Sequence, residues 1–249
     1  MKPLVLIPGI QGRCEWMQPA IDELAKEWRV IPCSLPGEPG GSAGVNGSFD
    51  SFVDCVDRVL DSAGVDSAVL CGVSFGGLIA LRYAATRPDR TRALILVSTP
   101  GPRWKLKPHL VRYMKWPTLS SPLFFAGAFG RFWPELCVTY PQVSERLRFC
   151  ASAMSRVAAA PAIPSRMSQR AQLASRESFE SDCARIKSPT LVITGERELD
   201  RVVTCDETMD YVSLIEGARF QRLEDTGHLG TISAPDRFAA IVSRFSRSL

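Results

Sequence analysis

The strongest chemical signal in this 249-residue chain is a serine placed between two glycines. Residues 72–76 are Gly-Val-Ser-Phe-Gly, with Ser74 at the centre. This Gly-x-Ser-x-Gly pattern is typical of a nucleophilic serine on a sharp turn from a strand into a helix. Glycines are needed there because side chains at those positions would clash in so strained a turn. The backbone N–H of Phe75, at the start of the helix, would then point at the reaction centre.

Two other interpretations of these glycines are available. A Gly-rich turn can simply end a strand, and some Gly-rich loops bind cofactor phosphates. Residues 72–77 lack both the spacing of a dinucleotide-binding fingerprint and the lysine of a P-loop. An apolar run at 67–71 precedes the motif and helical spacing follows it at 75–85, which is the context a nucleophile requires.

A nucleophilic serine needs a base, and the chain has two histidines, His109 and His228. His228 lies in the segment 224–230, Glu-Asp-Thr-Gly-His-Leu-Gly, just after the last predicted strand. Glycines on both sides suit a loop that presents an imidazole. His109 lies in a basic, helical-looking region and is interpreted as a surface or capping residue. We therefore predict His228 as the general base.

The acid that orients the imidazole should follow the fifth predicted strand, in the segment 194–203. This segment contains three carboxylates, Glu196, Glu198 and Asp200. The segment after the fourth strand, 98–102, contains none. Glu198 and Asp200 both remain open as the acid, and Glu196 is interpreted as a solvated side chain.

A second oxyanion donor should come from the loop after the first strand. Residues 8–12, Pro-Gly-Ile-Gln-Gly, have the required glycine-rich character. The backbone N–H of Ile10 is the predicted donor, and the side-chain amide of Gln11 is an alternative.

Short apolar runs that alternate with helical patterns must position these residues, and this alternation predicts an α/β fold. The nearly continuous apolar character of each strand indicates a sheet covered on both faces. Helical spacing includes Trp16, Ile21 and Leu24 and recurs at 49–63, 75–85 and 237–245. The predicted strands are 4–7, 29–33, 67–71, 93–98, 190–194 and 219–223.

The stretch 101–186 breaks the alternation. It contains three tryptophans, many alanines and several prolines, but no convincing strand. We predict a helical cap inserted into a core formed by residues 1–100 and 187–249. Within the insertion, the basic run 103–115 has apolar residues at helical spacing and predicts an amphipathic helix.

Composition excludes several function classes. The net charge of +4 comes from 30 basic and 26 acidic residues scattered along the chain, whereas nucleic-acid binders concentrate basic residues. No apolar run approaches the about 20 residues of a membrane span, and no signal-peptide pattern is recognised. The eight cysteines include no Cys-x-x-Cys pair, so we expect neither disulfides nor a zinc site, but reduced thiols in a cytoplasmic protein.

Together these motifs make nearly the whole chain resemble the α/β-hydrolase superfamily. The resemblance rests on residues 8–12 with Trp16, on 72–76, on Asp-Arg-Val-Val at 200–203 and on Gly-His at 227–228. It implies a mostly parallel sheet flanked by helices, a helical cap and no cofactor or metal. It also favours Asp200 over Glu198 as the acid.

The chain departs from the family pattern in three ways. Pro8 and Gly9 replace the usual His-Gly, and two extra residues separate Gly195 from Asp200. The chain also begins at the strand that the family treats as its third, which implies a sheet of about six strands without the N-terminal hairpin. The aspartate nucleophile of dehalogenases and epoxide hydrolases is contradicted by Ser74.

The expected function is that of a serine hydrolase that cleaves a carboxylic ester or related acyl bond through an acyl-enzyme. The aromatic content of the cap suggests a small, apolar acyl substrate. A C–C bond hydrolase or an acyltransferase of the same fold is an alternative. A ligand-binding or accessory protein with weak catalysis is another.

Overall fold

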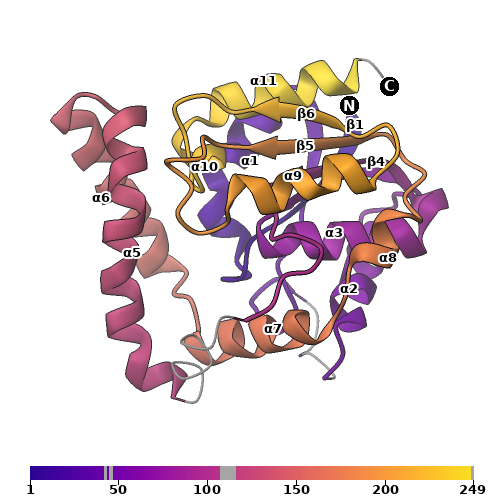
Figure 1. Cartoon of the computed structure of the whole chain (residues 1–249), viewed down its shortest axis with the longest axis horizontal. Helices are drawn as coiled ribbons and strands as arrows, with labels where there is room; N and C mark the ends of the chain where they lie inside the picture. The colour runs from indigo at the N-terminus through magenta and orange to yellow at the C-terminus, as the bar shows by residue number, and fades with distance from the viewer. Residues whose placement is uncertain (42–43, 45–46, 107–115, 248–249) are drawn as a thin grey trace.

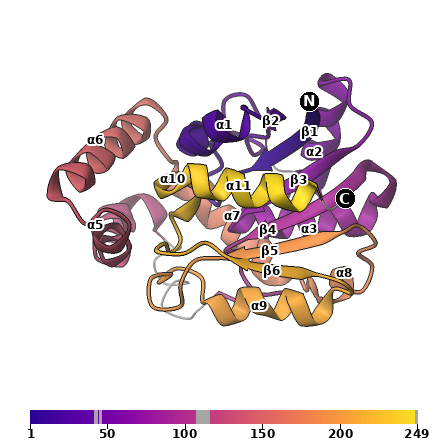
Figure 2. The ribbon, with the colours of Figure 1, turned by 90° about the horizontal axis from the view of Figure 1, so that it is seen from above.

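A computed structural model of the chain describes residues 1–41, 44, 47–106 and 116–247. Its centre is a parallel sheet of six strands in the order β2-β1-β3-β4-β5-β6 (Figure 2). This confirms the predicted α/β fold and sheet size. The strands are β1 (Lys2–Ile7), β2 (Trp28–Pro32), β3 (Ala68–Val73), β4 (Thr91–Val97), β5 (Thr190–Thr194) and β6 (Arg219–Arg222).

Helices cover both faces of the sheet because alternate strand residues point to opposite sides. In β1, Val5 and Ile7 join one buried cluster, while Leu4 and Leu6 join the other. In Figure 1, α11 lies above the sheet and α3 below it. The first cluster includes residues of α2 (Asp50–Ser62), α3 (Phe75–Thr86), α8 (Glu180–Cys183) and α9 (Cys205–Leu214). The second includes residues of η1 (Cys14–Met17), α1 (Gln18–Leu24) and α11 (Pro235–Ser246).

The edge strand β6 differs from the prediction that every strand is apolar and covered on both faces. Residues of β3 and β5 are buried throughout, but all four residues of β6 are exposed. The prediction is therefore wrong for β6, whose sequence is Arg-Phe-Gln-Arg, and also for the other edge strand β2, in which Arg29 and Pro32 are exposed. An edge strand has a neighbour on one side only, and the charged Arg219 and Arg222 suit it because they discourage pairing with another strand.

Between β4 and α8, in the stretch predicted to be a helical insertion, the described residues form three helices. They are α5 (Pro117–Thr139), α6 (Val143–Ala159) and α7 (Pro164–Arg176). Both ribbon views show α5 and α6 at one end of the molecule, beyond the sheet (Figures 1 and 2). Of the predicted amphipathic helix, residues 103–106 are not helical, and residues 107–115, with His109, lie outside the described residues.

Among the described residues, three elements were not predicted: η2 (Pro88–Arg90), α9 and α10 (Gly230–Ser233). The start of α9 could have been predicted from the sequence, because Thr204 and Glu207 have the Thr-x-x-Glu spacing of a capping box. In the structure the Thr204 hydroxyl accepts a hydrogen bond from the Glu207 backbone N–H.

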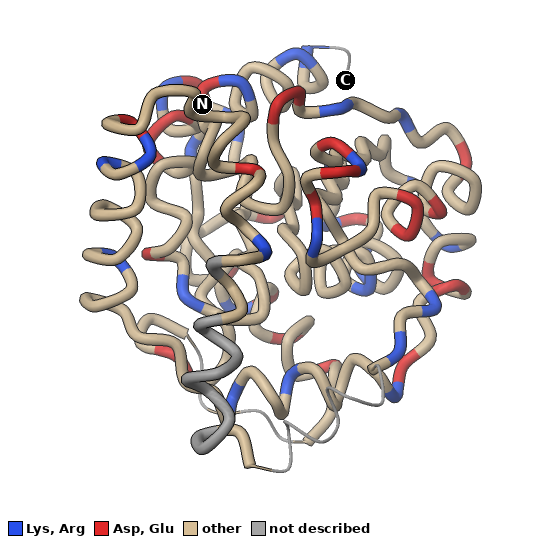
Figure 3. Tube along the Cα trace, turned by 60° about the vertical axis from the view of Figure 1, so that its left-hand side comes forward, with Lys and Arg blue, Asp and Glu red and all other residues tan. Residues whose placement is uncertain are grey.

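Charges of both signs are interspersed around the fold (Figure 3). None of the eight cysteines forms a disulfide. Within the ranges given above, no helix combines the length and apolar character needed to cross a membrane.

Candidate active site

Ser74 lies on a strained turn between β3 and α3. Its φ of 53° is in the left-handed region, which non-glycine residues rarely adopt. The turn is fixed from both sides. The Ser74 N–H donates to the Val97 carbonyl of the neighbouring strand at 2.8 Å, and the Ser74 carbonyl accepts from the Gly77 N–H at 2.8 Å. Such strain persists only where the surrounding structure enforces it, and it is often found at functional sites.

The two glycines of the motif are explained by close backbone contacts. A Cβ at Gly72 would lie 2.3 Å from the Gly76 carbonyl oxygen, and a Cβ at Gly76 would lie 2.4 Å from the Ile7 carbonyl oxygen. Both neighbours are backbone atoms, which cannot move aside as a flexible side chain can. Any larger residue at either position would therefore displace the turn that carries Ser74.

His228 lies beside Asp200. The imidazole Nδ1 is 3.1 Å from Asp200 Oδ2, and Asp200 Oδ1 accepts the backbone N–H groups of Val202 and Val203 at 3.0 and 2.9 Å. Asp200 follows β5, His228 follows β6 and Ser74 follows β3. Because the strands are parallel, their carboxyl ends share one edge of the sheet, so all three residues belong to that edge.

The electrostatics of this pair favour a charged acid and a basic imidazole. Burial opposes ionisation of Asp200, but the charge and hydrogen bond of His228 and the two backbone N–H groups lower its pKa. Burial likewise acts against protonation of His228, yet the charge and hydrogen bond of Asp200 and the charge of Glu135 raise its pKa. The pair therefore suits an imidazole that must accept and carry a proton.

The two other carboxylates after β5 have different surroundings. Glu198 is exposed, whereas Asp200 is 5% exposed and is the one bonded to His228. Glu196 is half-buried, and its Oε1 accepts the Asp225 N–H at 2.9 Å. Glu196 thus remains partly open to solvent, and it also anchors the start of the loop that carries His228.

The loop after β1 lies against Ser74. A Cβ at Gly9 would be 3.5 Å from the Ser74 Cβ and 2.8 Å from Gln11 Oε1, so the loop and the Gln11 side chain are both near the serine. Ile10 lies within this loop. Phe75 is the first residue of α3, where a helix leaves backbone N–H groups without intrahelical partners. Ile10 thus follows Gly9, which lies near Ser74, and Phe75 directly follows Ser74 itself.

Arg170, on α7, is a contact that the sequence did not suggest. It is 1% exposed, and its Nη1 donates to the Ile10 carbonyl at 2.9 Å. Its Nη2 donates to Glu38 Oε1 at 2.7 Å and to the Pro36 carbonyl at 3.2 Å. Arg170 therefore ties a helix of the insertion to the loop of the predicted oxyanion donor.

Glu135, on α5, also escaped notice in the sequence. It is fully buried, and its two carboxylate oxygens lie 3.0 and 3.1 Å from the backbone N of Leu229, the residue after His228. Burial raises the pKa of Glu135 to about 7. Nothing in a single sequence marks a helical glutamate as buried, because its burial depends on how α5 packs on the core.

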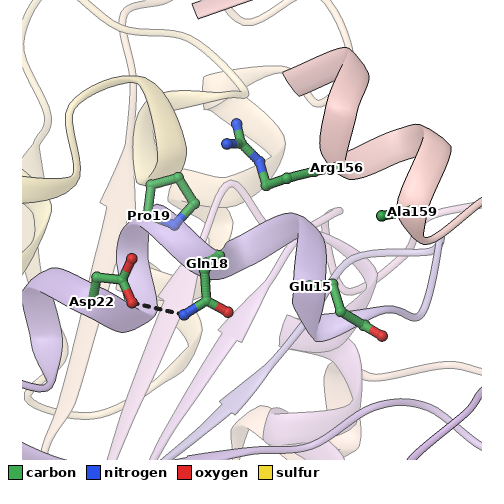
Figure 4. A pocket seen from close by; sticks show the side chains of 6 residues that line it. All are labelled: Glu15, Gln18, Pro19, Asp22, Arg156 and Ala159. Carbon is green, nitrogen blue, oxygen red and sulfur yellow. Dashed lines mark hydrogen bonds between the residues drawn. The ribbon is translucent and has the colours of Figure 1, made fainter. Parts of the chain in front are cut away.

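A pocket of about 320 Å³ lies between α6 and the segment formed by η1 and α1 (Figure 4). Its lining includes none of Ser74, Asp200 and His228. In it, Gln18 Nε2 donates to Asp22 Oδ1 at 2.7 Å. The pocket is lined by Glu15, Gln18, Pro19, Asp22, Arg156 and Ala159.

Across the described residues, no group of three or more His, Cys, Asp and Glu side chains is placed to hold a metal ion.

Comparison with known sequences gives a family match over most of the chain. The sequence profile of the family described as alpha/beta hydrolase fold matches residues 2–235. The chain is 28% identical to the 2-hydroxymuconate semialdehyde hydrolase of Pseudomonas putida over 223 residues, which cover 87% of this chain and 76% of that protein. It is 25% identical to the 2-hydroxy-6-oxo-2,4-heptadienoate hydrolase of Pseudomonas putida, with coverage of 98% and 88%.

A similarity to a much longer protein was also found. The chain is 28% identical over 256 residues to the polyketide synthase ThaQ of Burkholderia thailandensis. The match covers 97% of this chain but spans only 12% of the length of that synthase.

Solved structures with a similar fold are numerous. The enol-lactonase from Burkholderia xenovorans LB400 superposes with a TM-score of 0.82 at 22% identity, covering 99% of this chain and 91% of that one. The esterase from Exiguobacterium antarcticum superposes with a TM-score of 0.81 at 17% identity, with coverage of 99% and 92%. At these identities the likeness concerns the fold.

Proposed function

The chain belongs to the alpha/beta hydrolase fold family, and we propose that it is a serine hydrolase with a triad of Ser74, His228 and Asp200. The observation that carries the proposal is the 3.1 Å contact between His228 Nδ1 and Asp200 Oδ2, at the sheet edge where the strained turn places Ser74. We also propose that residues 101–186 act as the cap of this site. We also propose a cytoplasmic location, where cysteines stay reduced, because none of the eight cysteines forms a disulfide.

The proposed chemistry is acyl transfer to water. His228 takes the proton of the Ser74 hydroxyl, whose oxygen attacks the substrate carbonyl, and Asp200 stabilises the imidazolium. The backbone N–H groups of Phe75 and Ile10 hold the oxyanion, and one such donor contributes about 10²–10³ in rate. His228 then gives its proton to the leaving group and activates the water that hydrolyses the acyl-enzyme.

A C–C bond hydrolase is the second candidate. The names of the two Pseudomonas relatives concern a hydroxymuconate semialdehyde and a hydroxy-oxo-heptadienoate. The same serine and oxyanion donors could act on the ketone carbonyl of such a compound. We propose a small acyl or oxo-acid substrate with an apolar part in either case, because the insertion is rich in aromatic residues.

A substrate panel with matched serine variants tests the proposal. The panel contains p-nitrophenyl esters of graded chain length and one 2-hydroxy-6-oxo-2,4-dienoate, and kcat/KM is measured for each. We expect turnover by the wild type and by Ser155→Ala, an exposed serine on α6, and a loss of about 10³-fold or more in Ser74→Ala.

The pattern of activity separates the candidates. Turnover of the dienoate alone would favour the C–C bond hydrolase, and turnover of esters would favour the esterase. Equal rates for Ser74→Ala and the wild type would contradict both. Tight binding of these compounds without turnover would indicate a ligand-binding protein instead.

A further inference from the structure

The carboxylate of Glu135 contacts the loop that presents His228 from the side of the insertion. Glu135 lies near the end of α5, and both of its oxygens accept the backbone N–H of Leu229, at 3.0 and 3.1 Å. The N–H of Gly227 is a second backbone partner. The carboxylate therefore contacts the chain on both sides of His228.

Two neutral side chains add to this attachment. The hydroxyl of Thr139, at the end of α5, donates to the Asp225 carbonyl at 2.7 Å. The hydroxyl of Tyr140, the next residue, donates to the Ser233 carbonyl at 2.6 Å. Glu135, Thr139 and Tyr140 thus attach the end of α5 to the segment that carries His228. Of these three side chains, Glu135 is the charged one.

A purely structural role would not require a charge at position 135. Glu135 is fully buried, and its described hydrogen-bond partners are backbone N–H groups rather than a lysine or arginine. Burying a carboxylate without a cationic partner is unfavourable. A titratable group in this position, beside a proposed catalytic residue, therefore indicates that its charge has a role.

Two carboxylates act on His228 from different parts of the chain. Asp200, which follows β5, bonds to Nδ1, and Glu135, on α5, acts through its charge. Among the described residues, Asp200 and Glu135 are the only charged or titratable groups that raise the pKa of His228. Burial of the imidazole acts in the opposite direction and lowers this pKa. The imidazolium thus has one negative neighbour from the core and one from the insertion.

We propose that Glu135 is a positioning residue that holds the His228 loop against α5 and stabilises the imidazolium formed when Ser74 loses its proton. This inference rests on the proposed function for its role in turnover. Glu135 exchanges no proton in the reaction: the proton passes from Ser74 to His228 and then to the leaving group. The basicity of His228 would accordingly depend on where α5 lies.

Titration of a single histidine by NMR tests this coupling directly. The chain has two histidines, so a His109→Asn parent leaves His228 as the one imidazole signal to follow against pH. In this parent, we expect Glu135→Gln to shift the His228 titration to lower pH, because one negative neighbour is lost. Thr139→Val, which removes a contact to the same loop without removing charge, should leave the titration unchanged.

The titration has clear opposing outcomes. An unchanged His228 titration in folded Glu135→Gln, or an equal shift in Thr139→Val, would overturn the proposal. Glu135→Asp keeps the charge and should remain closer to the parent than Glu135→Gln. If Glu135→Gln does not fold, Glu135→Met removes the charge and is judged by the same criterion.

Kinetics supply a second readout that a structural role would not reproduce. In Glu135→Gln the acidic limb of kcat/KM should move to lower pH, and the plateau should fall about tenfold, as for one hydrogen bond to a charged group. A fall that is equal at every pH would contradict the electrostatic role. A wild type that hydrolyses no substrate would contradict the proposed function, yet the NMR titration would still decide whether Glu135 acts on His228.

Discussion

The backbone at Ser74 depends on atoms that are not part of its side chain. Gly76 packs so closely on β1 that an added Cβ would lie 2.4 Å from the Ile7 carbonyl oxygen. We predict that Gly76→Ala lowers the free energy of unfolding by about 1–3 kcal/mol, in the range of overpacking, and abolishes turnover. Denaturant unfolding and kcat measure the two effects.

A helical glycine elsewhere is the matched control. Gly130, on α5, has no atom within 4 Å of an added Cβ. Gly130→Ala should leave activity unchanged and should stabilise the protein by about 0.5–1 kcal/mol, because alanine favours helix. Similar losses of activity and stability in Gly76→Ala and Gly130→Ala would show that the close contact at Gly76 does not cause the effect.

The proposed choice of Asp200 over Glu198 as the acid rests on the carboxylate that contacts His228. Asp200→Asn keeps the size of the side chain but favours the wrong imidazole tautomer, so we predict a fall in kcat of about 10⁴-fold. Glu198→Gln should have little effect, because Glu198 is exposed and Asp200 is the carboxylate bonded to His228. A larger loss in Glu198→Gln than in Asp200→Asn would contradict the assignment.

Burial of Glu135 should make stability depend on pH. Its pKa is raised from 4.5 to about 7, so the folded state binds more protons than the unfolded state between these values. Stability therefore falls as pH rises through this window, by up to roughly 3 kcal/mol for this group. We predict that Glu135→Gln gains stability relative to the wild type from pH 5 to pH 8. A constant difference in unfolding free energy across this range would argue against the raised pKa.

The helix α7 is joined to the loop after β2 by a buried ion pair. Arg170 and Glu38 are 1% and 0% exposed, and their nearest charged atoms are 2.7 Å apart. We predict that Arg170→Met lowers the free energy of unfolding by about 3–5 kcal/mol, because it leaves a buried carboxylate without this partner. It should also slow turnover, since Arg170 bonds to the Ile10 carbonyl. Thermal denaturation and kcat provide the measurements.

A second arginine on α7 provides the control for that pair. Arg166 contacts the other oxygen of Glu38 at 3.1 Å, but its side chain is 37% exposed. Arg166→Met should cost at most about 1 kcal/mol, as solvent-exposed ion pairs do. The double variant of Arg170→Met with Glu38→Leu should lose less stability than the two single losses added together. Strict additivity of the two stability losses would mean that Arg170 and Glu38 have no coupling energy.

Elements were predictable from the sequence where local pattern and environment agree. The buried strands β3 and β5 are continuous apolar runs, and the turn at Ser74 is marked by its glycines, so both could be predicted. The exposure of β6 could not be predicted, because its position at the edge of the sheet follows from the strand order rather than from its own four residues. Glu135 and Arg170 were missed for a related reason. A charged residue on a helix reads as solvated unless the packing of that helix is known.

Across the whole molecule, the insertion is attached to two loops of the core that carry proposed site residues. Arg170, from α7, bonds to the loop of Ile10, and Glu135, from α5, bonds to the loop of His228. These loops follow β1 and β6, which are separated in the sheet by three strands. The geometry of the proposed site therefore depends on how the insertion and the sheet fit together, and not on the sheet alone.

The proposed mechanism depends above all on Ser74 as the nucleophile. The most direct measurement is reaction of the intact protein with a fluorophosphonate, followed by mass spectrometry of its peptides to locate the adduct. We predict one adduct, on Ser74, that forms far more slowly in His228→Ala. A folded wild-type protein that forms no adduct, or one whose adduct lies on another residue, would contradict this prediction.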